Sequence, residues 1–172
     1  MEMPVIIYGA PVLRKKSLEI DRKFDASSLA ENMFETLKKH SGIGLAAPQV
    51  GLLKNVFIIN TFPLEDQKTE PLEKAFINPE IIRTGETEDY YSEGCLSIPG
   101  IFEEVKRPEK IEVRYRDINF KPVEEVLDGM VARIFQHEYD HLQGMLFIDR
   151  LPALRRKMLR KKLEIIRTNK NH

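Results

Sequence analysis

The segment His137-Glu138-Tyr139-Asp140-His141 constrains the fold of this chain more than any other feature of its sequence. Two histidines four residues apart on an α-helix lie about 40° apart around the helix axis and about 6 Å apart along it. Both imidazoles can therefore reach one metal ion, and Glu138 can reach a water molecule beside that ion. The spacing predicts a helix that carries a metal site on one face. The alternative interpretation is a helix with two ordinary histidines.

Length and composition favour one intracellular domain. At 172 residues the chain can bury a core of its own, and we expect a single catalytic domain over residues 1–172. Basic and acidic residues number 27 each, so the total charge indicates no particular partner. The single cysteine, Cys95, excludes an intramolecular disulfide. Because the sequence shows neither a signal-peptide pattern nor an apolar run of about 20 residues, we expect a cytoplasmic protein without a membrane partner.

Hydrophobic periodicity predicts three helices and several short strands. The helices are expected over residues 28–39, 130–142 and 152–168. Ser28 and Glu31 resemble a capping box at the first helix, and Asp128 is a candidate cap for the second. The strands are expected over residues 56–59, 75–82, 111–115 and 123–127. Short strands followed by a central helix predict an α+β fold.

The predicted C-terminal helix, residues 152–168, is strongly basic. From Ala153 to the end, eight basic residues and one acidic residue give a net charge of +7, so the rest of the chain carries −7. This asymmetry is found in segments that contact nucleic acid and also in ordinary solvated helix faces. The apolar residues are expected to be buried on one side of the helix: Leu154, Met158, Leu159, Leu163 and Ile166.

Two histidines leave a catalytic metal site incomplete, because such sites typically have three protein ligands and one open position. One class of metalloendopeptidase places a third histidine where this chain has Phe147, and another uses a later glutamate, for which only Glu164 is available. Cys95 is the remaining candidate, since a thiolate and two imidazoles form a tetrahedral site with one open position. The alternatives for Cys95 are a small core residue and a nucleophile paired with one histidine.

Residues 42–49, with the sequence GIGLAAPQ, form the third notable segment. The glycines would allow a substrate backbone to approach closely, and the Gln49 amide is a donor suited to a developing oxyanion. The alternative interpretation is a plain glycine-rich turn.

Residues 42–49, residues 93–97 (EGCLS) and residues 136–141 (QHEYDH) resemble the three motifs of the peptide deformylase family in order and spacing, and residues 8–14 resemble its N-terminal segment. This resemblance implies an α+β domain with β-sheets wrapped around a central metal-binding helix, followed by the C-terminal helix. It also implies a hydrolase that removes the N-formyl group from the N-terminal methionine of nascent polypeptides and releases formate. The alternatives are a metalloendopeptidase and a ribosome- or RNA-binding module.

The resemblance assigns roles to individual residues. The metal ligands would be Cys95, His137 and His141, with Glu138 as general base and acid. The oxyanion would be held by Gln49 and the Leu96 N–H. The substrate backbone would pair with Ile43, Gly44 and Gly94, and the methionine pocket would include Met130 and Ile134. The family typically uses one Fe(II) ion, which nickel, cobalt or zinc can replace. The expected partners are N-formylmethionyl nascent peptides and the ribosome, the latter through the basic helix.

Overall fold

The computed structural model describes residues 1–169. Residues 170–172 lie outside the described range. They include Lys170 of the basic tail and are the last residues of the predicted domain. The described helices are α1 (Ala26–Lys39), α2 (Gly129–Leu142) and α3 (Ala153–Thr168), with 3₁₀ turns at Pro11–Arg14, Ala47–Val50 and Phe147–Arg150. No helix within residues 1–169 is long and apolar enough to cross a membrane.

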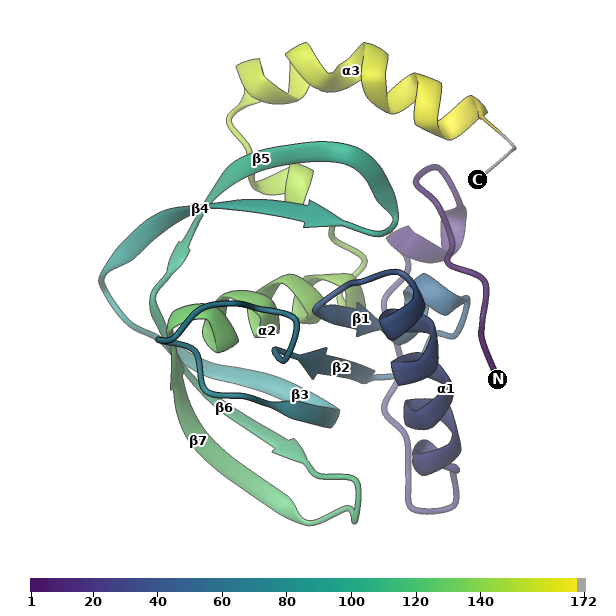
Figure 1. Cartoon of the computed structure of the whole chain (residues 1–172), viewed down its shortest axis with the longest axis vertical. Helices are drawn as coiled ribbons and strands as arrows, with labels where there is room; N and C mark the ends of the chain where they lie inside the picture. Colours follow the sequence, from purple (N-terminus) through teal and green to yellow (C-terminus); the bar gives the residue numbers. More distant parts are fainter. Residues whose placement is uncertain (170–172) are drawn as a thin grey trace.

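Two antiparallel sheets enclose the central helix α2 (Figure 1). The larger sheet has the order β1-β2-β3-β6-β7 and consists of β1 (Gly44–Ala46), β2 (Val56–Asn60), β3 (Glu73–Thr84), β6 (Lys110–Arg116) and β7 (Pro122–Asp128). The smaller sheet is the hairpin of β4 (Glu88–Cys95) and β5 (Ile98–Pro108). The α+β class and the sheets around a central helix are therefore confirmed.

Helix α2 is buried along most of its length because it packs against both sheets. On the side of the larger sheet, the Phe135 ring meets Phe57 edge-on at 4.9 Å and Phe76 at 5.3 Å between ring centroids. All five residues of β2 are buried, which explains the unbroken apolar run over residues 56–59. This packing fixes the orientation of the helix that carries His137 and His141.

The first two helices form where they are expected, but their caps differ from the prediction. Helix α1 begins at Ala26, and the Asp25 carboxylate accepts a hydrogen bond from the Ser28 N–H at 3.0 Å. The predicted capping box at Ser28 is therefore wrong, because an aspartate three residues earlier already satisfies that donor. Asp128 does occupy the N-cap position of α2, but its side chain makes no capping hydrogen bond.

Helix α3 lies across the outer side of the β4–β5 hairpin (Figure 1). Leu159, Leu163 and Ile166 are buried against the apolar residues of β5. The prediction that Leu154 and Met158 are buried is wrong, since they are 69% and 61% exposed. At 100° per residue, these two side chains point about 80–180° away from the buried ones, so α3 has a second, outward apolar stripe.

Candidate metal centre and substrate cleft

The packing of α2 beneath the β4–β5 hairpin brings the three predicted ligands together. Cys95 ends β4, and His137 and His141 lie one turn apart on α2. Their ligand atoms all lie within 4.8 Å of one another, and Cys95 Sγ is 3.4 Å from His141 Nε2. Both imidazoles are buried and Cys95 is partly buried. A strand end and a helix thus supply one thiol and two imidazoles to the same point.

The Glu93 carboxylate determines how His137 faces this point. Glu93 Oε1 lies 2.8 Å from His137 Nδ1, and Arg107 donates to the same carboxylate at 2.7 and 2.9 Å. Burial alone would raise the pKa of Glu93, but the hydrogen bonds from Arg107 and His137 hold it well below its usual range. An ionised carboxylate only accepts hydrogen bonds, so the proton belongs on Nδ1 of His137. Its Nε2 remains for a metal.

The pKa values of the two imidazoles are shifted in opposite directions. Burial and the charge of His137 hold the pKa of His141 well below its ordinary value, and a neutral imidazole is the form that binds metal. At His137 burial alone would lower the pKa, but hydrogen bonds with Cys95 and Glu93 raise it well above the ordinary value. The thiol and the Glu93 carboxylate therefore favour a positive charge at the His137 ring.

Glu138 places a carboxylate beside the three ligands. It is 3% exposed, and its Oε2 has no hydrogen-bond partner among residues 1–169. Burial raises the pKa of Glu138 to about 7, although a nearby cation would lower it. A Cβ added to Gly44 would stand only 2.6 Å from Glu138 Oε1, so the glycine leaves room for the carboxylate. A buried, unpaired carboxylate oxygen is costly, and such groups are concentrated at functional sites.

Gln49 presents its amide N–H₂ group to the same site. The Ala46 N–H donates to Gln49 Oε1 at 2.9 Å, which fixes the orientation of the amide. Gln49 Nε2 then donates to Cys95 Sγ at 3.4 Å and to Ser97 Oγ at 3.1 Å. The 3₁₀ turn that follows β1 therefore positions a rigid donor next to the thiol.

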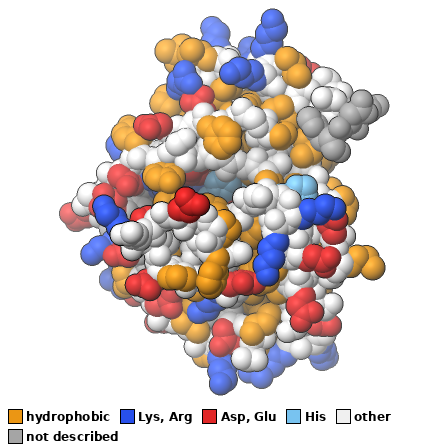
Figure 2. All heavy atoms as spheres, viewed as in Figure 1, with side chains coloured by type: hydrophobic (Ala, Val, Ile, Leu, Met, Phe, Trp, Pro, Cys, Tyr) orange, Lys and Arg blue, Asp and Glu red, His pale blue; other side chains and the backbone are white. Residues whose placement is uncertain are grey.

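A cleft of about 850 Å³ opens in front of these groups. Figure 2 shows a hollow near the middle of the displayed face, with a histidine side chain at its bottom. Within the described chain, β1 pairs only with β2 and β4 only with β5, so each has an unpaired edge. The cleft is lined by all of the residues predicted to bind substrate: Ile43, Gly44, Gly94, Met130 and Ile134. Gln49, Leu96, Cys95, His137 and Glu138 line it as well.

Sequence reasoning missed several residues of this cleft. Arg133 lies under the Tyr91 ring at 5.8 Å and donates to Glu93 at 2.7 Å. Leu64 also lines the cleft, although it belongs to a polar loop between β2 and β3. No local pattern marks these positions, except that Arg133 shares the helix with the histidines. The remaining missed residues are Glu2, Pro4, Val5, Ile7, His40, Ser41, Ser92, Pro99, Gly100 and Phe102.

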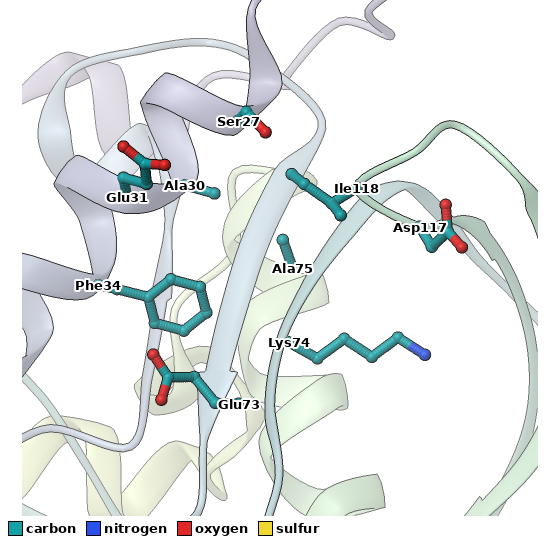
Figure 3. A pocket seen from close by; sticks show the side chains of 9 residues that line it. All are labelled: Ser27, Ala30, Glu31, Phe34, Glu73, Lys74, Ala75, Asp117 and Ile118. Atoms are coloured by element: carbon teal, nitrogen blue, oxygen red, sulfur yellow. The ribbon is translucent and has the colours of Figure 1, made fainter.

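A second, smaller pocket of about 270 Å³ lies between α1, β3 and the turn after β6. Figure 3 shows the Phe34 ring and Ile118 facing this pocket. Glu31 of α1 and Glu73, the first residue of β3, also line it. None of the predicted ligands or catalytic residues lines this pocket. The predicted catalytic residues therefore lie together in the larger cleft.

The two endopeptidase patterns do not complete the site. Phe147 is buried, and its ring stacks on the His137 ring at 5.8 Å between centroids, so this position supports a predicted ligand and offers no ligand atom of its own. Glu164 lies on the exposed side of α3, where it pairs with Arg167 at 3.0 Å. Cys95 is the residue that accompanies the two histidines.

Comparisons with known proteins agree with this geometry. The sequence model of the polypeptide deformylase family matches residues 2–157. The peptide deformylase of Cytophaga hutchinsonii is 44% identical over 95% of this chain and 89% of its own length, and that of Pseudothermotoga lettingae is 45% identical over 97% and 94%.

The solved Arabidopsis thaliana peptide deformylase 1B, in complex with an inhibitor, is 39% identical to this chain. It superimposes with a TM-score of 0.85 over 95% of this chain and 88% of its own. Full-length similarity in both sequence and structure establishes the family. The chain therefore belongs to the polypeptide deformylases, the metal-dependent hydrolases that remove the N-formyl group from nascent peptides.

Proposed function

We propose that Cys95, His137 and His141 hold one divalent metal ion. The observation that supports this most directly is the convergence of the three ligand atoms within 4.8 Å, with His137 oriented by Glu93. The family resemblance favours Fe(II), with nickel, cobalt or zinc as substitutes. When bound, the metal would supply the Lewis acidity that activates water and polarises the formyl carbonyl.

Glu138 is proposed as the proton carrier of the reaction. Its unpaired Oε2 takes the proton from the water that attacks the formyl carbon. The same carboxyl then delivers the proton to the amine nitrogen as the carbon–nitrogen bond breaks, which yields formate and a free N-terminus. A carboxyl whose pKa is raised by burial is suited to both transfers at neutral pH.

Gln49 and the Leu96 N–H are proposed to stabilise the oxyanion of the tetrahedral intermediate. The Gln49 amide is held by Ala46, so it needs little reorganisation when negative charge develops. The formyl carbon carries only hydrogen besides its oxygen and nitrogen. A closely packed site therefore admits the formyl group more readily than larger acyl groups.

The nascent peptide is proposed to bind as an extended strand between the unpaired edges of β1 and β4. Ile43 and Gly44 on one edge and Gly94 on the other supply backbone hydrogen-bonding groups. The methionine side chain enters the end of the cleft lined by Met130 and Ile134 of α2. Residues 1–172 would act as one catalytic domain in the cytoplasm, where a reducing environment preserves a cysteine ligand.

Replacement of Cys95 tests the proposed site. Anaerobically purified protein should contain one transition-metal ion per chain and release formate from formyl-Met peptides. The Cys95→Ala variant should lose both the metal, measured by elemental analysis, and turnover. Full metal content in Cys95→Ala would remove the thiol from the site.

The basic helix α3 is proposed to dock on the ribosome. Arg156, Arg160 and Lys161 are exposed on it, and most of the helix lies beyond the residues that match the family model. Replacing these three residues with Gln should weaken ribosome co-sedimentation and reduce its dependence on salt. Matched replacement of the exposed Lys15, Lys16 and Lys23 serves as the control. Unchanged ribosome affinity in the α3 variant would exclude this role.

A further inference from the structure

Arg150 ends the 3₁₀ turn Phe147–Arg150 and binds the helix that carries the two histidines. Its Nε lies 2.6 Å from Asp140 Oδ2, and its Nη2 lies 2.7 Å from Asp140 Oδ1. A guanidinium that meets a carboxylate through two parallel hydrogen bonds fixes orientation as well as distance. Asp140 is 3% exposed, so little water competes for its oxygens. This end of the turn is therefore fixed against α2.

The other end of the same turn packs on His137. The Phe147 ring is 2% exposed and stacks on the His137 ring, with 24° between the two ring planes. Glu93 meets the same imidazole at Nδ1. The hydrogen bond directs this ring nitrogen, whereas a closely packed ring on the face of the imidazole limits how far the imidazole can tilt. His137 is therefore held by two contacts that restrict different motions.

The turn is short and internally bonded, so its two ends move together. The Asp149 N–H donates to the Leu146 carbonyl at 3.0 Å, and the Leu146 N–H donates to Asp149 Oδ2 at 2.9 Å. Arg14 also reaches Asp149 Oδ2 at 2.5 Å, but these side chains are 44% and 28% exposed. An ion pair that water reaches contributes little. The contact of Arg150 with the buried Asp140 is therefore the stronger of the two side-chain anchors.

We propose that Arg150 is a positioning residue for the metal centre, and that it acts through Phe147. Its contact with Asp140 holds the turn in place, and the turn holds the Phe147 ring against His137. This proposal rests on the proposed function of His137 as a metal ligand. Asp140 also accepts a hydrogen bond from Arg107 at 2.9 Å, so it keeps a charged partner when Arg150 is replaced. Loss of Arg150 therefore loosens the turn and leaves the rest of the fold in place.

Binding of Co²⁺ to the metal-free protein tests the proposal. Arg150→Met should weaken Co²⁺ affinity about tenfold, measured anaerobically by competition with a chromogenic chelator, as expected for a residue that supports a ligand. The visible absorption bands of bound Co²⁺ respond to ligand geometry and should change in the same variant. Arg14→Met, which removes the exposed anchor of the same turn, is the matched control and should leave affinity and spectrum unchanged. If Arg150→Met does not fold, Arg150→Lys, which keeps the charge but loses the two-bond fork, gives the same comparison.

A double-mutant cycle shows whether Arg150 acts through the ring. Phe147→Leu should itself weaken Co²⁺ affinity, and adding Arg150→Met should then cost less than about twofold more, because the ring that the turn positions is already absent. Independent effects of the two substitutions, or wild-type affinity in a folded Arg150→Met variant, would overturn the proposal. Wild-type protein that does not bind Co²⁺, or that binds it equally well after Cys95→Ala, would instead overturn the proposed metal site.

Discussion

Glu93 Oε1 lies 2.8 Å from His137 Nδ1, and the same carboxylate is held by Arg107 and Arg133. The two guanidiniums fix the carboxylate, and the carboxylate in turn fixes the imidazole ring. Partners of this kind set the tautomer and orientation of a metal-binding histidine. The position of the proposed metal site therefore depends on charges that lie behind the predicted ligands.

Replacing Glu93 with Gln should weaken the metal site without removing a ligand. The amide keeps the size of the carboxylate but loses the negative charge that faces His137 and two guanidiniums. We expect metal affinity to fall about 10- to 100-fold, measured by competition with a chromogenic chelator. Glu104→Gln, at an exposed position of β5, is the matched control and should leave affinity unchanged. Wild-type affinity in Glu93→Gln would show that the carboxylate does not tune the ligand.

Arg107 connects the metal site to the stability of the fold. It is 1% exposed, and it bridges Glu93 at 2.7 Å and Asp140 at 2.9 Å. Removing one partner of a buried ion pair leaves a buried charge uncompensated. Arg107→Met should therefore lower the free energy of unfolding by about 3–5 kcal/mol, measured by urea denaturation.

The exposed Arg114, which lies 3.5 Å from Glu80, provides the control for Arg107. Arg114→Met should change the free energy of unfolding by less than about 1 kcal/mol, because water already solvates both charges. Equal effects of the two substitutions would contradict the structural role of the buried network.

The elements predicted best from the sequence are those whose burial is visible in a local pattern. Strand β2 is buried on both faces and therefore reads as a continuous apolar run. The sequence patterns did not predict strands β1, β4 and β5. Strand β1 has only three residues, and the first five residues of β4 are exposed, so neither shows a clear alternation. In α3, periodicity cannot tell which of two apolar stripes faces the domain.

The residues of the candidate site also differ in how well the sequence predicts them. The grouping of His137 and His141 could be predicted because one helical turn separates them. Cys95 became a candidate because neither endopeptidase pattern supplies a third ligand and the family resemblance assigns it to the site. The ion-pair network of Arg107 could not be predicted, because Arg107 contacts Asp140, which lies 33 residues away in the sequence. Phe102, which lines the cleft, was missed because only the pairing of β4 with β5 brings its ring against Gly94.

Gly44 offers a test of how closely the proposed general base, Glu138, must be placed. An Ala Cβ there would stand 2.6 Å from Glu138 Oε1 and 2.9 Å from Ile134 Cγ2. The end of a flexible side chain moves more easily than backbone, so we expect Gly44→Ala to fold and to displace the Glu138 carboxylate. A misplacement of about 1 Å can reduce turnover about 100-fold. Steady-state kinetics should show a lower kcat, whereas Gly85→Ala, whose Cβ meets Lys110 at 3.3 Å, should not.

The Glu138→Gln variant isolates the proposed proton transfer. Glutamine has the size and shape of glutamate but cannot accept a proton at neutral pH. Because Glu138 lies beside the three ligands and is not one of the three converging groups, the variant should fold and retain its metal. Turnover of formyl-Met peptides should fall by about 10²–10⁴-fold, the usual contribution of a general base. That loss corresponds to about 3–5 kcal/mol of transition-state stabilisation.

Two measurements separate the possible roles of Glu138. Substrate affinity should change little in Glu138→Gln, because binding depends on the edges of β1 and β4 and on the apolar end of the cleft. Metal content, determined on the same preparation, distinguishes a base from a ligand. Loss of the metal would make Glu138 a ligand, and near-normal turnover with full metal content would assign the proton transfer to another group. A large fall in kcat with metal and KM preserved is the result that the unpaired Oε2 predicts.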